Sequence, residues 1–139
     1  MPERLLFMLS KIQTRLTAHV KGRLSENGIS LSPGQIGILL VLDRDRKTTM
    51  GQISRTLDID NAAITRLVDK LEKQNLVERN INPDDRRQML ITITKDGLNK
   101  AGTVKKIVKV VNRKITEGFT EEEIAIYKRV NLAIIQKFG

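Results

Sequence analysis

Asn-Pro-Asp-Asp-Arg-Arg-Gln-Met-Leu-Ile-Thr-Ile-Thr-Lys-Asp-Gly, residues 82–97, places a charged turn before an alternating apolar run and a threonine that can begin a helix. A second extended run, Val77–Ile81, comes immediately before it. Together they predict a β-hairpin with a charged tip, which follows one helix and leads into another. Two strands that hold Arg86 and Arg87 clear of the rest of the chain can reach a phosphate-lined groove. The hairpin therefore indicates a protein that binds DNA.

Capping boxes predict where three of the helices begin. In each, a Ser or Thr caps the helix and a Glu or Gln three residues later reaches back to the cap. The three are Ser32–Gln35, Thr49–Gln52 and Thr120–Glu123. With the apolar periodicity, they predict helices over residues 3–26, 32–43, 49–57, 61–75, 95–117 and 120–138. The expected fold class is mainly α with a small β-wing: a winged helix-turn-helix head plus a terminal-helix dimerisation region.

The two helices within residues 49–75 have the spacing of a helix-turn-helix, in which the second helix enters the major groove of DNA. Asp60 or Asn61 would cap this second helix. Its buried stripe comprises Ile64, Leu67, Val68 and Leu71. The opposite face, which also carries Asp69, holds the side chains that can read base edges: Asn61, Ala62, Thr65 and Arg66. The alternative is an ordinary solvated helix face, but the hairpin that follows favours DNA.

The hairpin turn carries two arginines and two aspartates. We expect Arg86 or Arg87 to enter the adjacent minor groove, where narrow A·T-rich segments concentrate negative potential. An aspartate, Asp84 or Asp85, would hold the guanidinium in position. The alternative is a surface Asp–Arg pair that contributes about 0–1 kcal/mol to stability and nothing to function. The residues predicted to bind DNA in the turn are Asp85, Arg86 and Arg87.

Long apolar stripes at both ends of the chain predict a homodimer. A head of about 60 residues cannot cover them all, so we expect the first and the last two helices to pack against a second copy. The expected organisation is a single domain over residues 1–139, with the winged helix-turn-helix over 31–97 and dimerisation helices in 1–30 and 98–139. A monomeric helix bundle is the alternative.

Composition excludes several classes of protein. The chain of 139 residues has no cysteine and a single histidine, so no catalytic site, metal site or cofactor is expected. Aromatic residues make up 3%, too few for stacking single-stranded bases. No apolar run is long enough to span a membrane and no signal peptide is recognised, which predicts a cytoplasmic protein. The net charge is +9, yet residues 43–97 carry 11 basic and 10 acidic side chains, so DNA contacts there depend on individually placed residues.

The chain resembles the multiple antibiotic resistance regulator (MarR) family of winged helix-turn-helix transcription factors. The resemblance is carried by Leu31–Gln35, Ile64–Glu72, Leu76–Arg79 and the segment from Asp85-Arg86-Arg87 through Ile93-Thr94 to Gly97. It implies a homodimer on a pseudo-palindromic operator of double-stranded DNA, usually as a repressor, often released by a small anionic or phenolic effector. Asn75 stands where many members have glycine, and asparagine tolerates the left-handed backbone that a glycine adopts there.

Two further interpretations remain open from the sequence. Arg15, His19 and Tyr127 interrupt apolar stripes with polar groups and are candidates for an effector site, although the edges of an ordinary core look the same. A winged helix can also serve as a protein-interaction module without specific DNA binding, and the nearly neutral head favours that alternative. Arg66 and the two wing arginines argue against it.

Overall fold

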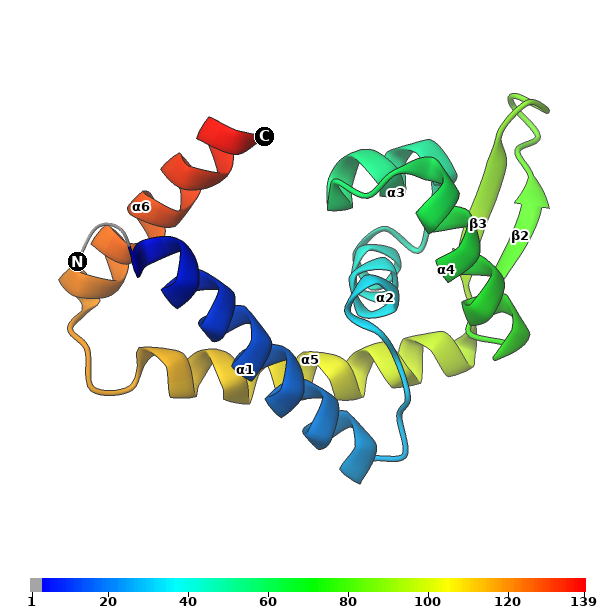
Figure 1. Ribbon diagram of the computed structural model, residues 1–139. Coiled ribbons are helices and arrows are strands. Elements are labelled where there is room, and N and C mark those ends of the chain that lie inside the picture. The colour runs from blue at the N-terminus through cyan, green and yellow to red at the C-terminus, as the bar shows by residue number, and fades with distance from the viewer. Residues whose placement is uncertain (1–3) are drawn as a thin grey trace. The chain divides into compact units, whose positions relative to one another are not determined.

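The computed structural model describes residues 4–139, which form six helices and one three-stranded sheet (Figure 1). The elements in chain order are α1 (Leu5–Glu26), α2 (Pro33–Asp45), β1 (Lys47–Thr49), α3 (Met50–Leu57), α4 (Asn61–Lys73), β2 (Val77–Ile81), β3 (Met89–Ile93), α5 (Lys95–Thr116) and α6 (Glu121–Phe138). The predicted fold class, mainly α with a small β-wing, is confirmed. Each predicted helix boundary lies within two residues of the observed one, except that residue 3 lies outside the described residues.

Two of the three predicted capping boxes form completely. Ser32 and Thr120 each accept a hydrogen bond from the backbone N–H three residues on, and the side chains of Gln35 and Glu123 return the bond to the cap. Thr49 caps α3 through the N–H of Gln52 at 3.2 Å, but the side chain of Gln52 does not return to it. It bonds Thr56 Oγ1 at 3.4 Å and Arg55 Nη2 at 3.1 Å instead. The second half of that prediction is therefore wrong.

The strand β1 was not expected from the sequence. It pairs antiparallel with β3, with Thr48 opposite Ile91, and the sheet order is β1-β3-β2. Its three residues are Lys-Thr-Thr, which have no apolar alternation to mark a strand. Because β1 and β2 flank β3, the hairpin is joined to the body through its second strand, and Ile91 and Ile93 are buried.

The chain forms two compact units, one ending at Ile107 and the other running from Val108 to Gly139. The first unit contains an aliphatic core in which the α3–α4 pair and the sheet are anchored. Its fully buried side chains include Leu24, Ile38, Leu39, Leu42, Ile53, Ile64, Val68, Leu71, Val77, Ile91 and Val104. The predicted stripe of α4 is confirmed at Ile64, Val68 and Leu71, whereas Leu67 is half-buried.

The second unit contains the end of α5 and α6. No residue of α6 is buried, although the helix carries a large apolar surface. Its exposed large hydrophobic residues are Ile126, Tyr127, Val130, Leu132, Ile135 and Phe138. None of the helices described here has the length and apolar character needed to cross a membrane.

Gly97 marks the point where α5 leaves the sheet, and its lack of a side chain is required there. A Cβ at this position would lie 2.2 Å from the carbonyl oxygen of Leu76 and 2.7 Å from Ile93 Cγ1. We expect Gly97→Ala to lower the free energy of unfolding by about 2–3 kcal/mol, because backbone must move to admit the methyl group. Gly102→Ala, in the same helix with no atom within 4 Å, should raise it by up to about 1 kcal/mol. Denaturant titrations compare the two variants, and equal stabilities would contradict this account.

Candidate nucleic-acid interface

A tight turn fixes α4 against α3. Asp58 adopts the left-handed conformation at φ 55°, and the N–H of Ile59 donates to the carbonyl of Ser54 at 3.2 Å. The hydroxyl of Ser54 donates back to the carbonyl of Ile59. Asp60 then caps α4, with its Oδ1 accepting from the N–H of Ala63 at 2.9 Å. The alternative between Asp60 and Asn61 is thus resolved in favour of Asp60, and the Asn61 side chain is not needed for the cap.

The structure places Asn61, Ala62, Thr65 and Arg66 together on the exposed face of α4. The hydroxyl of Thr65 donates to the carbonyl of Asn61 at 2.9 Å, which fixes the side chain and leaves its methyl group to make apolar contacts. Arg66 forms no ion pair with any of residues 4–139. This face offers an amide, two methyl-bearing side chains and a guanidinium, which are groups that can read base edges in the major groove. Their contact with bases remains a prediction.

Asp69 has a different role from the one its position on that face suggested. Its Oδ1 lies 2.7 Å from Nη1 of Arg79 on β2. Nη2 of the same guanidinium lies 2.9 Å from Oε1 of Glu72, and Glu72 Oε2 accepts from the Arg79 backbone N–H at 3.3 Å. Arg79 therefore clamps α4 to the wing, with both carboxylates turned towards the clamp.

The clamp also changes the electrostatics of the site. The hydrogen bond from Arg79, opposed by partial desolvation, lowers the pKa of Glu72, and the reciprocal hydrogen bond raises the pKa of Arg79. The single positive charge of Arg79 is thereby shared between the two acidic side chains beside α4 and offsets part of their charge. The sequence analysis did not predict the ion pairs of Arg79 with Asp69 and Glu72. The sequence nevertheless indicates them, because Arg79 lies midway between Val77 and Ile81 on one face of the strand, where an apolar residue is expected. A charge on the inner face of a strand indicates an ion pair.

The tip of the wing is ordered by its own side chains. The hairpin of β2 and β3 extends beyond α4 (Figure 1). Asn82 Oδ1 accepts from the N–H of Asp84 at 3.1 Å, and the N–H of Gln88 donates to the carbonyl of Asp85 at 3.0 Å. Asn82 and Gln88 also bond through their side-chain amides at 3.2 Å. The turn therefore has a defined shape that can present its arginines in a fixed direction.

Of the possible Asp–Arg pairs in the turn, the structure contains the one between Asp85 and Arg87. Asp85 Oδ1 accepts from both the backbone N–H and Nε of Arg87, at 3.1 and 3.2 Å. The Arg87 side chain is 91% exposed, so its two Nη groups point into solvent, and Arg86 is also exposed. The hydrogen bond from Nε to Asp85 orients the guanidinium of Arg87. Its two Nη groups remain available to an anionic partner.

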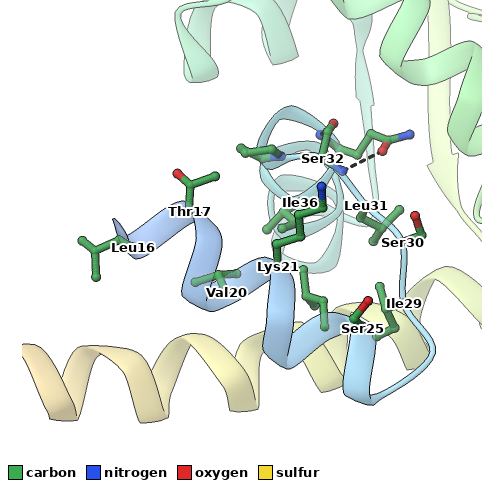
Figure 2. A pocket seen from close by; sticks show the side chains of 13 residues that line it. Leu16, Thr17, Val20, Lys21, Ser25, Ile29, Ser30, Leu31, Ser32 and Ile36 are labelled. Atoms are coloured by element: carbon green, nitrogen blue, oxygen red, sulfur yellow. Dashed lines mark hydrogen bonds between the residues drawn. The ribbon is translucent and has the colours of Figure 1, made fainter. Parts of the chain in front are cut away.

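The remaining predicted site residues, those of the effector site, belong to different units of the chain. Arg15 and His19 are exposed on α1, and Tyr127 is 44% exposed on α6 in the other unit. A pocket of about 640 Å³ lies in the first unit, between the second half of α1 and the start of α2 (Figure 2). Neither Arg15 nor His19 belongs to its lining. No group of three or more potential metal ligands occurs among residues 4–139.

Comparison with known proteins agrees with this geometry. The sequence model of the MarR family matches residues 28–88. The uncharacterized HTH-type transcriptional regulator YsmB of Bacillus subtilis is 32% identical over 109 residues, which span 78% of this chain and 75% of the relative. The chain belongs to the MarR family. The regulator MhqR of Bacillus subtilis is 26% identical over 137 residues, which span 93% of this chain and 90% of the relative.

Solved structures of the MarR family share the whole fold. A crystal structure of a mutant MarR from E. coli complexed with operator DNA has a TM-score of 0.84 at 22% identity. The match covers 94% of this chain and 92% of that one. As a member of the MarR family the chain is a DNA-binding transcriptional regulator, and its winged helix-turn-helix fold matches that structure. The relatives named above are transcriptional regulators, not enzymes. The alternative of a protein-interaction module is not supported.

Proposed function

We propose that this MarR-family regulator is a homodimer that represses transcription from a pseudo-palindromic operator and is released by a small effector. Residues 31–97 form the winged helix-turn-helix, and the helices within residues 1–30 and 98–139 provide dimerisation. Each protomer inserts α4 into the major groove, and Arg87 enters the adjacent minor groove. Asn61, Ala62, Thr65 and Arg66 contact bases or phosphate, while Arg86 and Asp85 support the contact of the wing.

One observation carries the DNA-binding part of the proposal: both probes are exposed, and ion pairs of Arg79 join α4 to the wing. Asp60 caps α4, so the side chains on the exposed face of the helix are not used in the cap. Arg87 extends from an ordered turn, and Arg79 links α4 to β2, the strand that leads to this turn. A helix and a wing held at a fixed separation can enter successive grooves without reordering. Because the head is nearly neutral, these placed cations rather than a broad positive field supply the attraction.

The unburied apolar surface supports the homodimer. α6 has no buried residue, and the first half of α1 exposes Leu6 and Phe7, each at 73%. Large apolar side chains exposed along a helix, as on each of these two helices, are typical of a protein–protein interface. A symmetric dimer covers the same surface on both copies at once, and it also matches the symmetry of a pseudo-palindromic operator.

The pocket between α1 and α2 supports a small effector. Its apolar walls include Leu16, Val20, Leu24, Ile29, Leu31 and Ile36. Lys21 extends from α1 towards Ser32 at the start of α2 (Figure 2). An apolar cavity with one cation and several hydroxyl groups suits a small aromatic carboxylate or phenol. Arg15, His19 and Tyr127 remain predicted effector contacts outside this lining.

Arg87→Ala tests the wing. We expect operator affinity to fall about tenfold and the slope of log K against log salt to flatten by about one for each wing, because a cation leaves the DNA surface. The probe is a duplex selected by the wild-type protein from a random-sequence library, titrated at two salt concentrations. Arg23→Ala is the matched control, since Arg23 also pairs with an acid, Glu26 at 3.7 Å, but lies in α1.

Unchanged affinity and slope in Arg87→Ala would remove the wing from the binding mechanism. Genomic footprinting with and without cell extract then tests regulation. Footprints that lie over promoters and fade when extract is added support a repressor released by a small molecule. Footprints that persist in extract count against effector release.

A further inference from the structure

Two large apolar side chains lie exposed near the tip of the wing. Ile81 is 60% exposed and Met89 is 38% exposed, and they are direct partners across the β2–β3 pair. Single exposed apolar residues are common on protein surfaces. Here, however, two of them are adjacent on one face of a hairpin whose turn is, apart from Pro83, charged and polar. They form an apolar ledge of two side chains.

Strand alternation shows which way this ledge faces. Ile81, Arg79 and Val77 share one face of β2, because side chains alternate along a strand. Arg79 contacts Asp69 and Glu72 of α4, so this is the face turned towards the recognition helix. Ile81 lies one alternate position, about 7 Å, further out along the strand. The ledge therefore lies in the corner between α4 and the projecting part of the wing.

We propose that the Ile81–Met89 ledge packs against the deoxyribose rings of the DNA strand that separates the two grooves. The inference rests on the proposed placement of α4 in the major groove and of the wing tip in the adjacent minor groove. With both in place, the corner between them must hold the intervening sugar–phosphate strand. The outer faces of the sugars are apolar C–H surfaces, which Ile81 and Met89 can cover and from which they can exclude water.

The charges around the ledge favour a nucleic-acid strand over a protein partner. Arg66, one turn before Asp69 on the exposed face of α4, lies to one side, and Arg87 lies at the tip on the other. The nearby carboxylates of Asp69 and Glu72 are both engaged by Arg79. An apolar strip between two available cations matches a backbone in which apolar sugars alternate with phosphates. Because the ledge faces sugars rather than bases, it adds affinity and sets register without reading sequence.

Ile81→Ser tests the ledge, with Asn80→Ser as its matched control. Asn80 is the adjacent exposed residue of the same strand, and its side chain is on the opposite face. On a duplex selected by the wild-type protein, we expect the Kd of Ile81→Ser to rise about tenfold. Met89→Ser should raise it about threefold, and Ile81→Val should restore most of the affinity. The salt slope should stay at the wild-type value, because no cation is lost.

Hydroxyl-radical footprinting provides the direct readout, because the radical attacks deoxyribose hydrogens. Ile81→Ser should lose protection at the sugars between the two grooves while keeping the footprint elsewhere. Wild-type affinity and sugar protection in Ile81→Ser, together with a loss in Arg87→Ala, would overturn the ledge and leave the wing in place. Wild-type behaviour of both variants would overturn the proposed wing contact itself. Ile81→Ser could instead weaken dimerisation while each remaining dimer binds DNA with wild-type affinity. That result would assign the ledge to a protein–protein interface.

Discussion

Ala62→Asp is expected to abolish sequence-specific binding, with a loss of at least about 100-fold in operator affinity. Ala62 is exposed at the second position of α4, beside Asn61 and one turn before Thr65 and Arg66. A carboxylate there would enter the major groove next to phosphates and base acceptors, and a like-charge juxtaposition of this kind costs several kcal/mol. The protein itself should remain folded, since an acidic residue in the first turn of a helix favours the helix dipole.

Ala62→Asn separates charge from size. Asparagine has almost the shape of aspartate without the charge, so this variant should lose much less affinity. Electrophoretic mobility shifts against a random competitor measure specificity, and circular dichroism confirms that the fold is retained. If Ala62→Asp still protects the wild-type footprint, α4 is not in the major groove.

Ile135→Glu is expected to convert the protein into a folded monomer. Ile135 is 65% exposed in the protomer, so a charge there has little effect on the stability of a single chain. In the proposed dimer the same charge would be buried with no opposite charge beside it. Operator affinity should fall about 100-fold or more, because two linked half-site contacts become one. Sedimentation velocity gives the mass, and fluorescence anisotropy gives the affinity.

Gln136→Glu provides the matched control, because it introduces the same charge at the next residue, away from the apolar stripe of α6. Ile107 is a poorer position for this test. It is 5% exposed within its own protomer, so a charge there would unfold the chain before it reported on the dimer. A variant at Ile135 that remains dimeric with full affinity would place the dimer interface elsewhere.

Local patterns predicted much of the head correctly. Ser32, Thr49 and Thr120 cap the helices they were expected to cap, since a cap depends on residues three positions apart. Asn75 has a φ of 60°, in agreement with its place at a position where glycine is common. The alternation of Ile91 and Ile93 with threonines correctly predicted a strand with one buried face. Each of these features is encoded within a few residues of where it acts.

The sequence by itself determined the helices, the hairpin and the charged residues at its tip, because periodicity, caps and turn residues act over short separations. Only the tertiary structure decided that β1 joins the sheet and that Asp69 turns away from the readout face to pair with Arg79. A three-residue polar strand depends on its partner β3, and the clamp of Arg79 depends on where β2 passes α4. Contacts of this kind are set by the path of the chain in space, which no local pattern records.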